Sequence, residues 1–291
     1  LGLAAGETKL SVLARADGTY DLEGSTPITT PAAGLASAKI TTRWDKKAYE
    51  LQSVHLTATP ADPRETLAAI GVHAKGWYEP GIGRIVLMPV GPQPSPGVNI
   101  GPQGMMVTGL GKPEAPMGVE AVLMGDLSAL DHTLAYWAQV TSLQGLGGPW
   151  TGHVKGTRAK DGRLEFETRV SSSDLFMTTH RGPTNLTLAG AYTPSDDRLD
   201  LKGFDLTSTY GRLAGNGAVA EVGSRRLADV SGVLEPRWET LDPIIAGSLE
   251  PGAQVRATVR PYHLKGSLAA GSTSQILKGM EGALEVDLAS A

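Results

Sequence analysis

The feature that most constrains this chain is the alternation of apolar and polar residues over short runs. Residues 164–170 are Leu-Glu-Phe-Glu-Thr-Arg-Val, and residues 255–260 are Val-Arg-Ala-Thr-Val-Arg. A period of two places the apolar side chains on one face of a strand and the polar ones on the other. Antiparallel sheets with one apolar and one wet face show this pattern. The sequence therefore predicts a mainly β chain built from antiparallel strands.

The size of the available side chains limits how this sheet can be covered. Only 5% of the 291 residues are aromatic, and 37 are glycine. Large side chains contribute most of the burial in a compact two-layer core, whereas a thin core suits a single curved sheet or a stacked array. We therefore expect an elongated, curved antiparallel sheet, either a groove or repeat-built, with a few short accessory helices.

Four short windows have helical character. Residues 62–70 begin with Asp-Pro, a capping residue followed by proline at the first helical position. Residues 127–140 and 238–249 carry leucine, isoleucine and tryptophan at helical spacing, although Pro243 is expected to shorten the second. The fourth predicted helix covers residues 272–280.

Composition along the chain predicts three parts. Residues 1–80 are expected to form a β segment with one short helix. Gly and Pro accumulate in residues 81–118, which predicts an irregular connection with at most one short strand at 84–88. Residues 119–291 are expected to form two related strand-helix-strand units of an elongated β groove.

A weak internal duplication supports the last assignment. Residues 125–131 resemble residues 232–234 together with 238–242, and placing Leu130 on Leu241 gives an offset of 111 residues. In both copies a strand leads into a short amphipathic helix, and turns and further strands follow. Each repeat would therefore contain several strands and one helix.

The alternation also predicts which side chains face a groove or a core. A one-residue slip of register would expose all of them, so burial of one face fixes the register. Glu165, Asp200 and Arg256 are expected on the wet face. The expected lining residues are Leu51, Leu164, Phe166, Leu199, Leu201, Phe204, Leu206, Val255, Val259, Leu284 and Val286.

Motifs that carry chemistry are missing from the sequence. There is no cysteine, none of the six histidines forms a His-Glu-x-x-His pair, and neither a Gly-x-Ser-x-Gly elbow nor a Walker sequence occurs. Asp196, Asp197 and Asp200 fit a solvated turn better than a calcium loop. Glu165 and Glu167 are the candidates for a glycosidase pair, but they alternate with apolar residues as an ordinary wet face does. We expect no catalytic residues, no metal and no cofactor.

Charge and the chain start add two expectations. The net charge is −4 with no block of Lys or Arg, which disfavours nucleic acid as a partner. The first six residues, Leu-Gly-Leu-Ala-Ala-Gly, lack the basic start and long apolar run of a signal peptide. We expect the chain to be a piece of a longer polypeptide whose anchor lies outside it.

Several strands in the second half resemble a known family. Residues 186–190 (Leu-Thr-Leu-Ala-Gly), 198–206, 211–217 (Gly-Arg-Leu-Ala-Gly-Asn-Gly) and 229–234 resemble the strand sequences of AsmA-like and TamB-like envelope proteins. The resemblance is best over residues 186–291. It implies a long β groove, apolar inside, that spans the periplasm of a diderm cell envelope and conducts phospholipids. It implies phospholipid acyl chains and envelope membrane proteins as partners, and no catalytic residues.

Two functions remain open at this point. The first is a non-enzymatic, hydrophobic β groove for phospholipid transport between membranes or for outer-membrane biogenesis. The second is a structural or adhesive envelope β-repeat scaffold with a closed core, in which the chain's own helices and a second sheet cover the apolar face. The two differ in whether the helices at 127–140 and 238–249 fill the apolar face.

Overall fold

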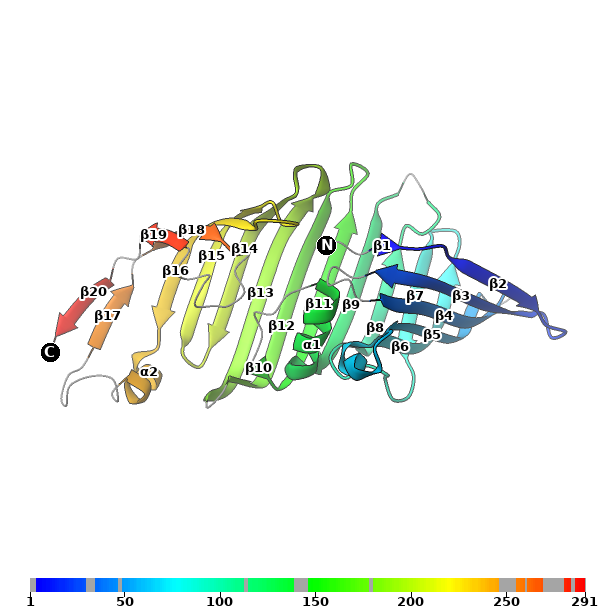
Figure 1. Ribbon diagram of the computed structural model, residues 1–291, viewed down its shortest axis with the longest axis horizontal. Coiled ribbons are helices and arrows are strands. Elements are labelled where there is room, and N and C mark those ends of the chain that lie inside the picture. Colours follow the sequence, from blue (N-terminus) through cyan, green and yellow to red (C-terminus); the bar gives the residue numbers. More distant parts are fainter. Residues whose placement is uncertain are drawn as a thin grey trace. The chain divides into compact units, whose positions relative to one another are not determined.

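The computed structural model describes most of the chain in ten segments, shown in Figure 1. These are residues 4–29, 35–46, 49–112, 115–138, 146–177, 180–245, 255–259, 261–268, 280–283 and 286–290. The chain forms two compact units. Unit 1 comprises Leu1–Asp161 with Phe176–Thr179, and unit 2 comprises Gly162–Leu175 with His180–Ala291.

Unit 1 is an antiparallel sheet in which strands that are consecutive in the chain are neighbours from β2 to β9, and β11 then pairs with β9 (Figure 1). The short β1 pairs with the C-terminal end of β3. The strands are β1 (Ala4–Ala5), β2 (Lys9–Ala14), β3 (Thr19–Thr29), β4 (Leu35–Asp45), β5 (Glu50–Pro60), β6 (Ile70–Glu79), β7 (Arg84–Pro89), β8 (Asn99–Thr108), β9 (Met117–Asp126), β10 (Leu146–Gly147) and β11 (Pro149–Arg158).

In unit 2 the antiparallel strands follow the order β12-β13-β14-β15-β16-β18-β19, and β17 and β20 pair separately. Its strands are β12 (Leu164–Met177), β13 (His180–Thr193), β14 (Arg198–Ser208), β15 (Gly211–Ala220), β16 (Leu227–Pro236), β17 (Val255–Val259), β18 (Tyr262–Ser267), β19 (Met280–Ala283) and β20 (Val286–Ser290). The prediction of a mainly β, antiparallel chain with short accessory helices is confirmed.

Three of the four predicted helices are present. They are η1 (Pro63–Ala68), a 3-10 helix, α1 (Leu127–Ala138) and α2 (Trp238–Ile245), while a 3-10 turn, η2 (Pro194–Asp196), precedes β14. The fourth predicted helix, at residues 272–280, lies outside the described residues apart from its last position, which begins β19.

Residues 81–118 are a correction to the prediction of an irregular connection. Strands β7 and β8 fill much of this segment, and β9 begins at Met117. The strand expected at 84–88 is confirmed as β7. Proline misled the prediction because most of these prolines lie in the links between strands or at a strand end, where no ladder hydrogen bond is lost. The boundary between the two units falls at residues 161 and 162 instead.

Helix α1 packs at one end of the unit 1 sheet, next to η1 (Figure 1). The indole nitrogen of Trp137 donates a hydrogen bond of 2.6 Å to the carbonyl of Ala68, at the end of η1. A second indole, that of Trp150 on β11, donates 3.1 Å to the carbonyl of Gly97 in the link before β8. Both tryptophans are buried, so these bonds satisfy backbone carbonyls that water does not reach.

Among the described residues, each unit contains two antiparallel neighbouring strands with an α-helix between them in the chain. In unit 1, β9 and β11 are antiparallel neighbours with α1 between them in the chain, and in unit 2 β16, α2 and β18 repeat this order. The second strands carry His-Val-Lys-Gly from His153 and His-Leu-Lys-Gly from His263. His153 lies 3.1 Å from Glu120 on β9, and His263 lies 2.6 Å from Asp229 on β16. The two elements thus share a cross-strand contact as well as an order.

Candidate functional site

One face of the unit 1 sheet is apolar across successive strands. Residues that are directly opposite in an antiparallel pair lie on the same face. The register joins Trp44 to Leu51, Leu51 to Gly76, Gly76 to Leu87 and Leu87 to Met105, from β4 to β8. A row of side chains without charge therefore crosses five strands.

This face contains a pocket of about 510 Å³. Its volume falls in the range of roughly 300–1,000 Å³ that small-molecule sites occupy. None of the described residues that line it carries a charge, and none belongs to α1 or η1. The lining residues are Leu22, Ile40, Thr42, Trp44, Leu51, Val54, Leu56, Tyr78, Ile85, Leu87, Met105, Val107, Leu110 and Gly111.

Three buried apolar residues lie at or next to the floor of the pocket. Val54, Ala74 and Leu87 each expose at most 4% of their surface and form a cluster on β5, β6 and β7. Leu51 and Ile85 pack against this cluster and remain partly exposed. The pocket therefore has a rigid base and partly exposed apolar walls.

A β-bulge in β5 keeps this strand in phase with the pocket. Leu51 pairs with Trp44 and Ser53 pairs with Arg43, so Gln52 is an extra residue on β5. An extra residue shifts the alternation by one position. As a result Leu51 and Val54, which are three positions apart, both face the pocket.

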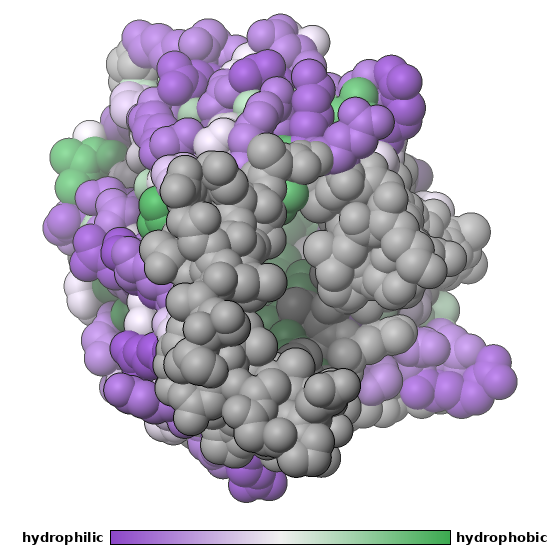
Figure 2. Space-filling view, turned by 90° about the vertical axis from the view of Figure 1, so that its left-hand side faces the viewer, coloured by the Kyte–Doolittle hydropathy of each residue, from purple (hydrophilic) through white to green (hydrophobic). Residues whose placement is uncertain are grey.

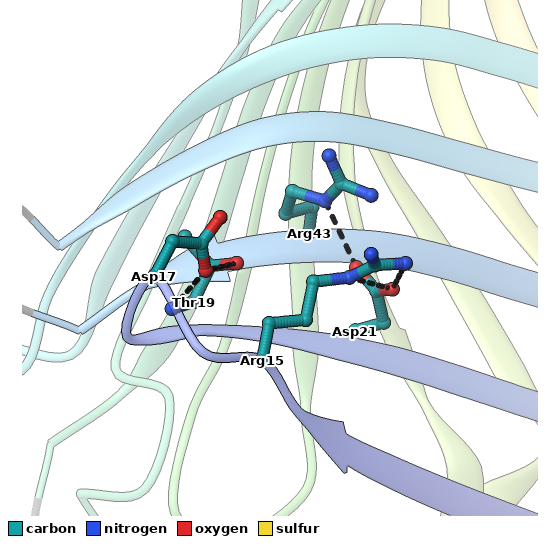
Figure 3. Close-up of polar contacts among 5 residues, drawn as sticks. All are labelled: Arg15, Asp17, Thr19, Asp21 and Arg43. Atoms are coloured by element: carbon teal, nitrogen blue, oxygen red, sulfur yellow. Dashed lines mark hydrogen bonds and ion pairs between the residues drawn. The ribbon is translucent and has the colours of Figure 1, made fainter.

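The opposite face of unit 1 carries charged residues where β3 and β4 pair. Asp21 on β3 accepts a hydrogen bond from Arg15 and one of 2.9 Å from Nε of Arg43 (Figure 3). These two contacts, the one from Arg15 being the stronger, lower the pKa of the Asp21 carboxyl. In the turn before β3, Thr19 donates from both its hydroxyl (2.7 Å) and its backbone N–H (2.9 Å) to Asp17, and these bonds lower the pKa of Asp17 (Figure 3).

Unit 2 also has an apolar face, on which five of the predicted lining residues lie, Phe166 on β12 and four on β14. Leu199 and Leu201 precede Phe204 and Leu206 on β14, with a register shift between Leu201 and Phe204. Like the bulge at residue 52 of β5, this bulge shifts the alternation by one position, so that the apolar residues on both sides of it face the same way. All four predicted side chains therefore share one face, and each is half-buried.

Aromatic rings lie over glycines on this face. A Cβ added to Gly190 on β13 would lie 2.9 Å from the ring of Phe166, and one added to Gly215 on β15 would lie 2.9 Å from the ring of Phe204. The nearest atoms to such a Cβ are backbone carbonyl oxygens, that of Asp200 at 2.5 Å for Gly190 and that of Ser231 at 2.2 Å for Gly215, so backbone and ring together leave no space for a side chain at either position. Burial raises the pKa of Tyr262 on β18, whose hydroxyl also lies over Gly215.

The outer face of unit 2 carries ion pairs. Arg212 on β15 lies 2.7 Å from Asp205 on β14 and 3.6 Å from Glu235 on β16, and hydrogen bonding from Arg212 lowers the pKa of Asp205. In the view of Figure 2, hydrophilic residues (purple) make up most of the outward surface of the described residues. Such exposed pairs contribute little to stability.

The acidic residues that the sequence offered for a glycosidase pair lie next to arginine and lysine side chains. Glu165 is 3.4 Å from Arg163 and 3.6 Å from Lys202, and Glu167 is 2.7 Å from Arg169. Both glutamates are exposed.

The three aspartates around β14 each have a polar partner, and that of Asp196 is the hydroxyl of Ser195, which donates a hydrogen bond of 2.9 Å. Asp197 accepts hydrogen bonds from the hydroxyl of Tyr192 and the backbone N–H of Gly223, and Asp200 pairs with Arg198 at 2.7 Å. Within the described residues no three His, Asp or Glu side chains form a metal-binding group.

The remaining predicted lining residues lie on other strands. Leu164 on β12 is 39% exposed. Val255 and Val259 lie on β17, and Val286 lies on β20. Leu284 lies outside the described residues. Of the predicted set only Leu51 lines the pocket in unit 1, so the structure does not bring the predicted residues together in one site.

Most of the pocket was missed by the sequence prediction. Ile40, Thr42 and Trp44 alternate along β4, and this period of two was the signal that could have found them. Ile85 and Leu87 were hidden because β7 is apolar at neighbouring positions on both faces. Met105 and Val107 lie in the segment that was predicted to be irregular.

Comparison with protein-family models, with curated proteins and with solved structures gives no match for this chain. Among the helices of the described residues, none is long and apolar enough to cross a membrane.

Proposed function

We propose that this chain is a non-enzymatic segment of a cell-envelope protein and binds the acyl chains of phospholipids on its apolar sheet face. The observation that carries the proposal is the uncharged pocket of about 510 Å³ in unit 1. Transfer of methylene groups from water to such a surface is favourable by about 0.8 kcal/mol each. A flexible hydrocarbon chain is the ligand that an uncharged, apolar site of this kind suits best.

The position of the helices supports an open site over a closed scaffold core. Helix α1 contacts η1, β9 and β10, and the pocket is lined by residues of β3 to β8 and the turn after β8. The pocket residue Ile40 keeps 38% of its surface exposed. An apolar face of this kind, which its own helices leave open, is typical of an interaction site.

The cellular role is a proposal that follows from the strand sequences. Their resemblance to AsmA-like and TamB-like proteins suggests phospholipid transport between the membranes of a diderm envelope, or outer-membrane biogenesis. The segment would then act in the periplasm, and envelope membrane proteins would be partners at the ends of the parent chain.

Two neighbouring methionines on β8 allow a matched test. Met105 lines the pocket, whereas Met106 pairs with Glu120 on the opposite face. Because the chain has no cysteine, Met105→Cys and Met106→Cys can each be labelled with an environment-sensitive fluorophore. We expect phospholipid vesicles to change the emission at position 105 and to leave position 106 unchanged.

Recovery of lipid from the purified chain completes the test. The chain is extracted with organic solvent after purification, and bound phospholipid is measured by mass spectrometry. Recovered phospholipid together with a response at position 105 alone supports the proposal. If no lipid is recovered and neither label responds, the acyl-binding function is wrong and the scaffold function remains.

A further inference from the structure

The apolar pocket contains two polar atoms without a hydrogen-bond partner. The hydroxyl of Thr42 and the indole nitrogen of Trp44 are both buried, and neither has a partner among the described residues. Both residues line the pocket, and Thr42 is only 9% exposed. Buried polar groups in native proteins are nearly always hydrogen-bonded. Two exceptions in one pocket therefore point to a partner supplied by a ligand.

The two groups are held in place by the sheet. Thr42 and Trp44 are alternate residues of β4 and so lie on the same face. Thr42 is flanked by Leu22 and Val54 on the neighbouring strands, while the ring of Trp44 lies 5.9 Å from that of Tyr20. Neither group has a hydrogen-bond partner among these neighbours, so a ligand that enters the pocket can supply one.

The chemistry of the two groups defines the ligand atom. An indole N–H can only donate, so its partner must be an acceptor. A hydroxyl can donate to the same kind of atom. A carboxylate is a poor acceptor for this pocket. No described lining residue is charged, so a carboxylate would have no cation to pair with, and an unpaired charge in an apolar site is costly. The fitting acceptor is a neutral carbonyl oxygen.

We propose that the pocket recognises esterified acyl chains, with Trp44 donating to the ester carbonyl and Thr42 providing a second polar contact. This inference rests on the proposed function, because it names the class of acyl compound that the same pocket binds. Both atoms are buried, so the entering chain displaces the side chains next to them and brings its carbonyl to the base of the pocket. Free fatty acids and ether-linked lipids are then the weaker ligands.

The test compares ligands that differ only at the carbonyl. A diester phosphatidylcholine and its diether analogue have the same chains and headgroup, but the diether lacks both carbonyls. Methyl palmitate and palmitate likewise differ in charge at one end. Binding is measured by competition with a radiolabelled phospholipid. We expect the wild type to bind the diester about three to ten times more tightly than the diether, and methyl palmitate more tightly than palmitate.

Three variants assign the preference to the pocket. Trp44→Phe removes the N–H and keeps the ring, and Thr42→Val removes the hydroxyl at nearly constant volume. The control is Trp77→Phe, because Trp77 is 42% exposed and its indole donates to Glu79 on the opposite face. We expect Trp44→Phe to bind both lipids about equally, Thr42→Val to reduce the preference, and Trp77→Phe to keep it.

The outcomes separate this inference from the proposed function. If the wild type binds diester and diether equally, acyl binding stands and ester recognition is wrong. The same holds if Trp44→Phe and Thr42→Val both keep the full preference, or if palmitate binds as tightly as its methyl ester. If the wild type binds none of these compounds, the proposed function itself fails. The comparison of ligands on the wild type decides the inference even if Trp44→Phe does not fold.

Discussion

A lysine placed at the mouth of the pocket separates acyl binding from folding. Ile40 lines the pocket, where it pairs with Gly24 and Leu56, and it keeps 38% of its surface exposed. In Ile40→Lys the methylene stem can cover the same neighbours while the ammonium group reaches water. Full burial of an isoleucine is worth about 1.5–3 kcal/mol, so this partial loss should lower the free energy of unfolding by about 1–2 kcal/mol.

The effect on lipid binding should be larger. An ammonium group at the pocket mouth keeps nearby methylenes of the ligand in water. If three methylenes stay out, the loss is about 2.4 kcal/mol at 0.8 kcal/mol each, a reduction in affinity of roughly fiftyfold. The control is Thr41→Lys, which adds the same charge one residue along β4. Thr41 pairs with Glu23 and His55 on the outer face, so this variant should bind lipid as the wild type does.

The assay measures both quantities on the same samples. Urea denaturation followed by tryptophan fluorescence gives the free energy of unfolding, and competition with a radiolabelled phospholipid gives the affinity. A wild type that binds phospholipid and an Ile40→Lys variant that binds it equally well would show that the pocket is not the site. Equal losses in both lysine variants would show that net charge, and not position, controls binding.

Three further predictions concern stability, measured by urea denaturation. Insertion of one glycine after Lys202 puts the apolar residues on the two sides of the β14 bulge out of phase and should destabilise unit 2 by about 2–3 kcal/mol, because half-buried side chains such as Leu201 then turn to the wet face; Lys202→Ala, which keeps the number of residues, should change the free energy of unfolding by less than about 0.5 kcal/mol. Trp137→Phe leaves the carbonyl of Ala68 without its indole donor and should cost about 1–3 kcal/mol; no loss would show that water replaces the bond. Two arginines lower the folded pKa of Asp21, so its contribution is present above the unfolded value of about 4 and is lost as pH falls through the folded pKa. Asp21→Asn should remove that part of the acid sensitivity between pH 7 and pH 3, and an unchanged pH profile would contradict this.

Alternation predicted the fold class because it depends on one short-range property, the period of a strand. Helical spacing located α1, and the Asp-Pro start located η1, because these signals are also short-range. The prediction for residues 81–118 was wrong because proline occurs both in loops and at the ends of strands. Proline breaks a ladder in the middle of a strand but is tolerated at its ends, so the composition of residues 81–118 could not distinguish a loop from the strands β7 and β8 with prolines in and beside them.

The candidate site was less predictable than the fold because it depends on which strands are neighbours. Leu51 was identified from its own strand, and its companion Trp44 lies opposite it on β4. Ile85 and Leu87 on β7 join the same pocket through the register of β6. Nothing in the local sequence of β4 or β7 states this pairing, so a pattern taken strand by strand finds the apolar faces but not the pocket that they form.

The breaks in the alternation carry as much information as the alternation itself. In β5 the apolar residues Leu51 and Val54 are three positions apart, and in β14 the same spacing separates Leu201 and Phe204. A strict period of two would put the second half of each strand on the wet face. The structure places a bulge at both breaks and so returns the apolar residues to one face. A three-residue step between two alternating runs, with polar or glycine residues inside the step, therefore indicates one bulged strand with a continuous apolar face. Two separate strands would instead need turn residues and a reversal of direction at that point.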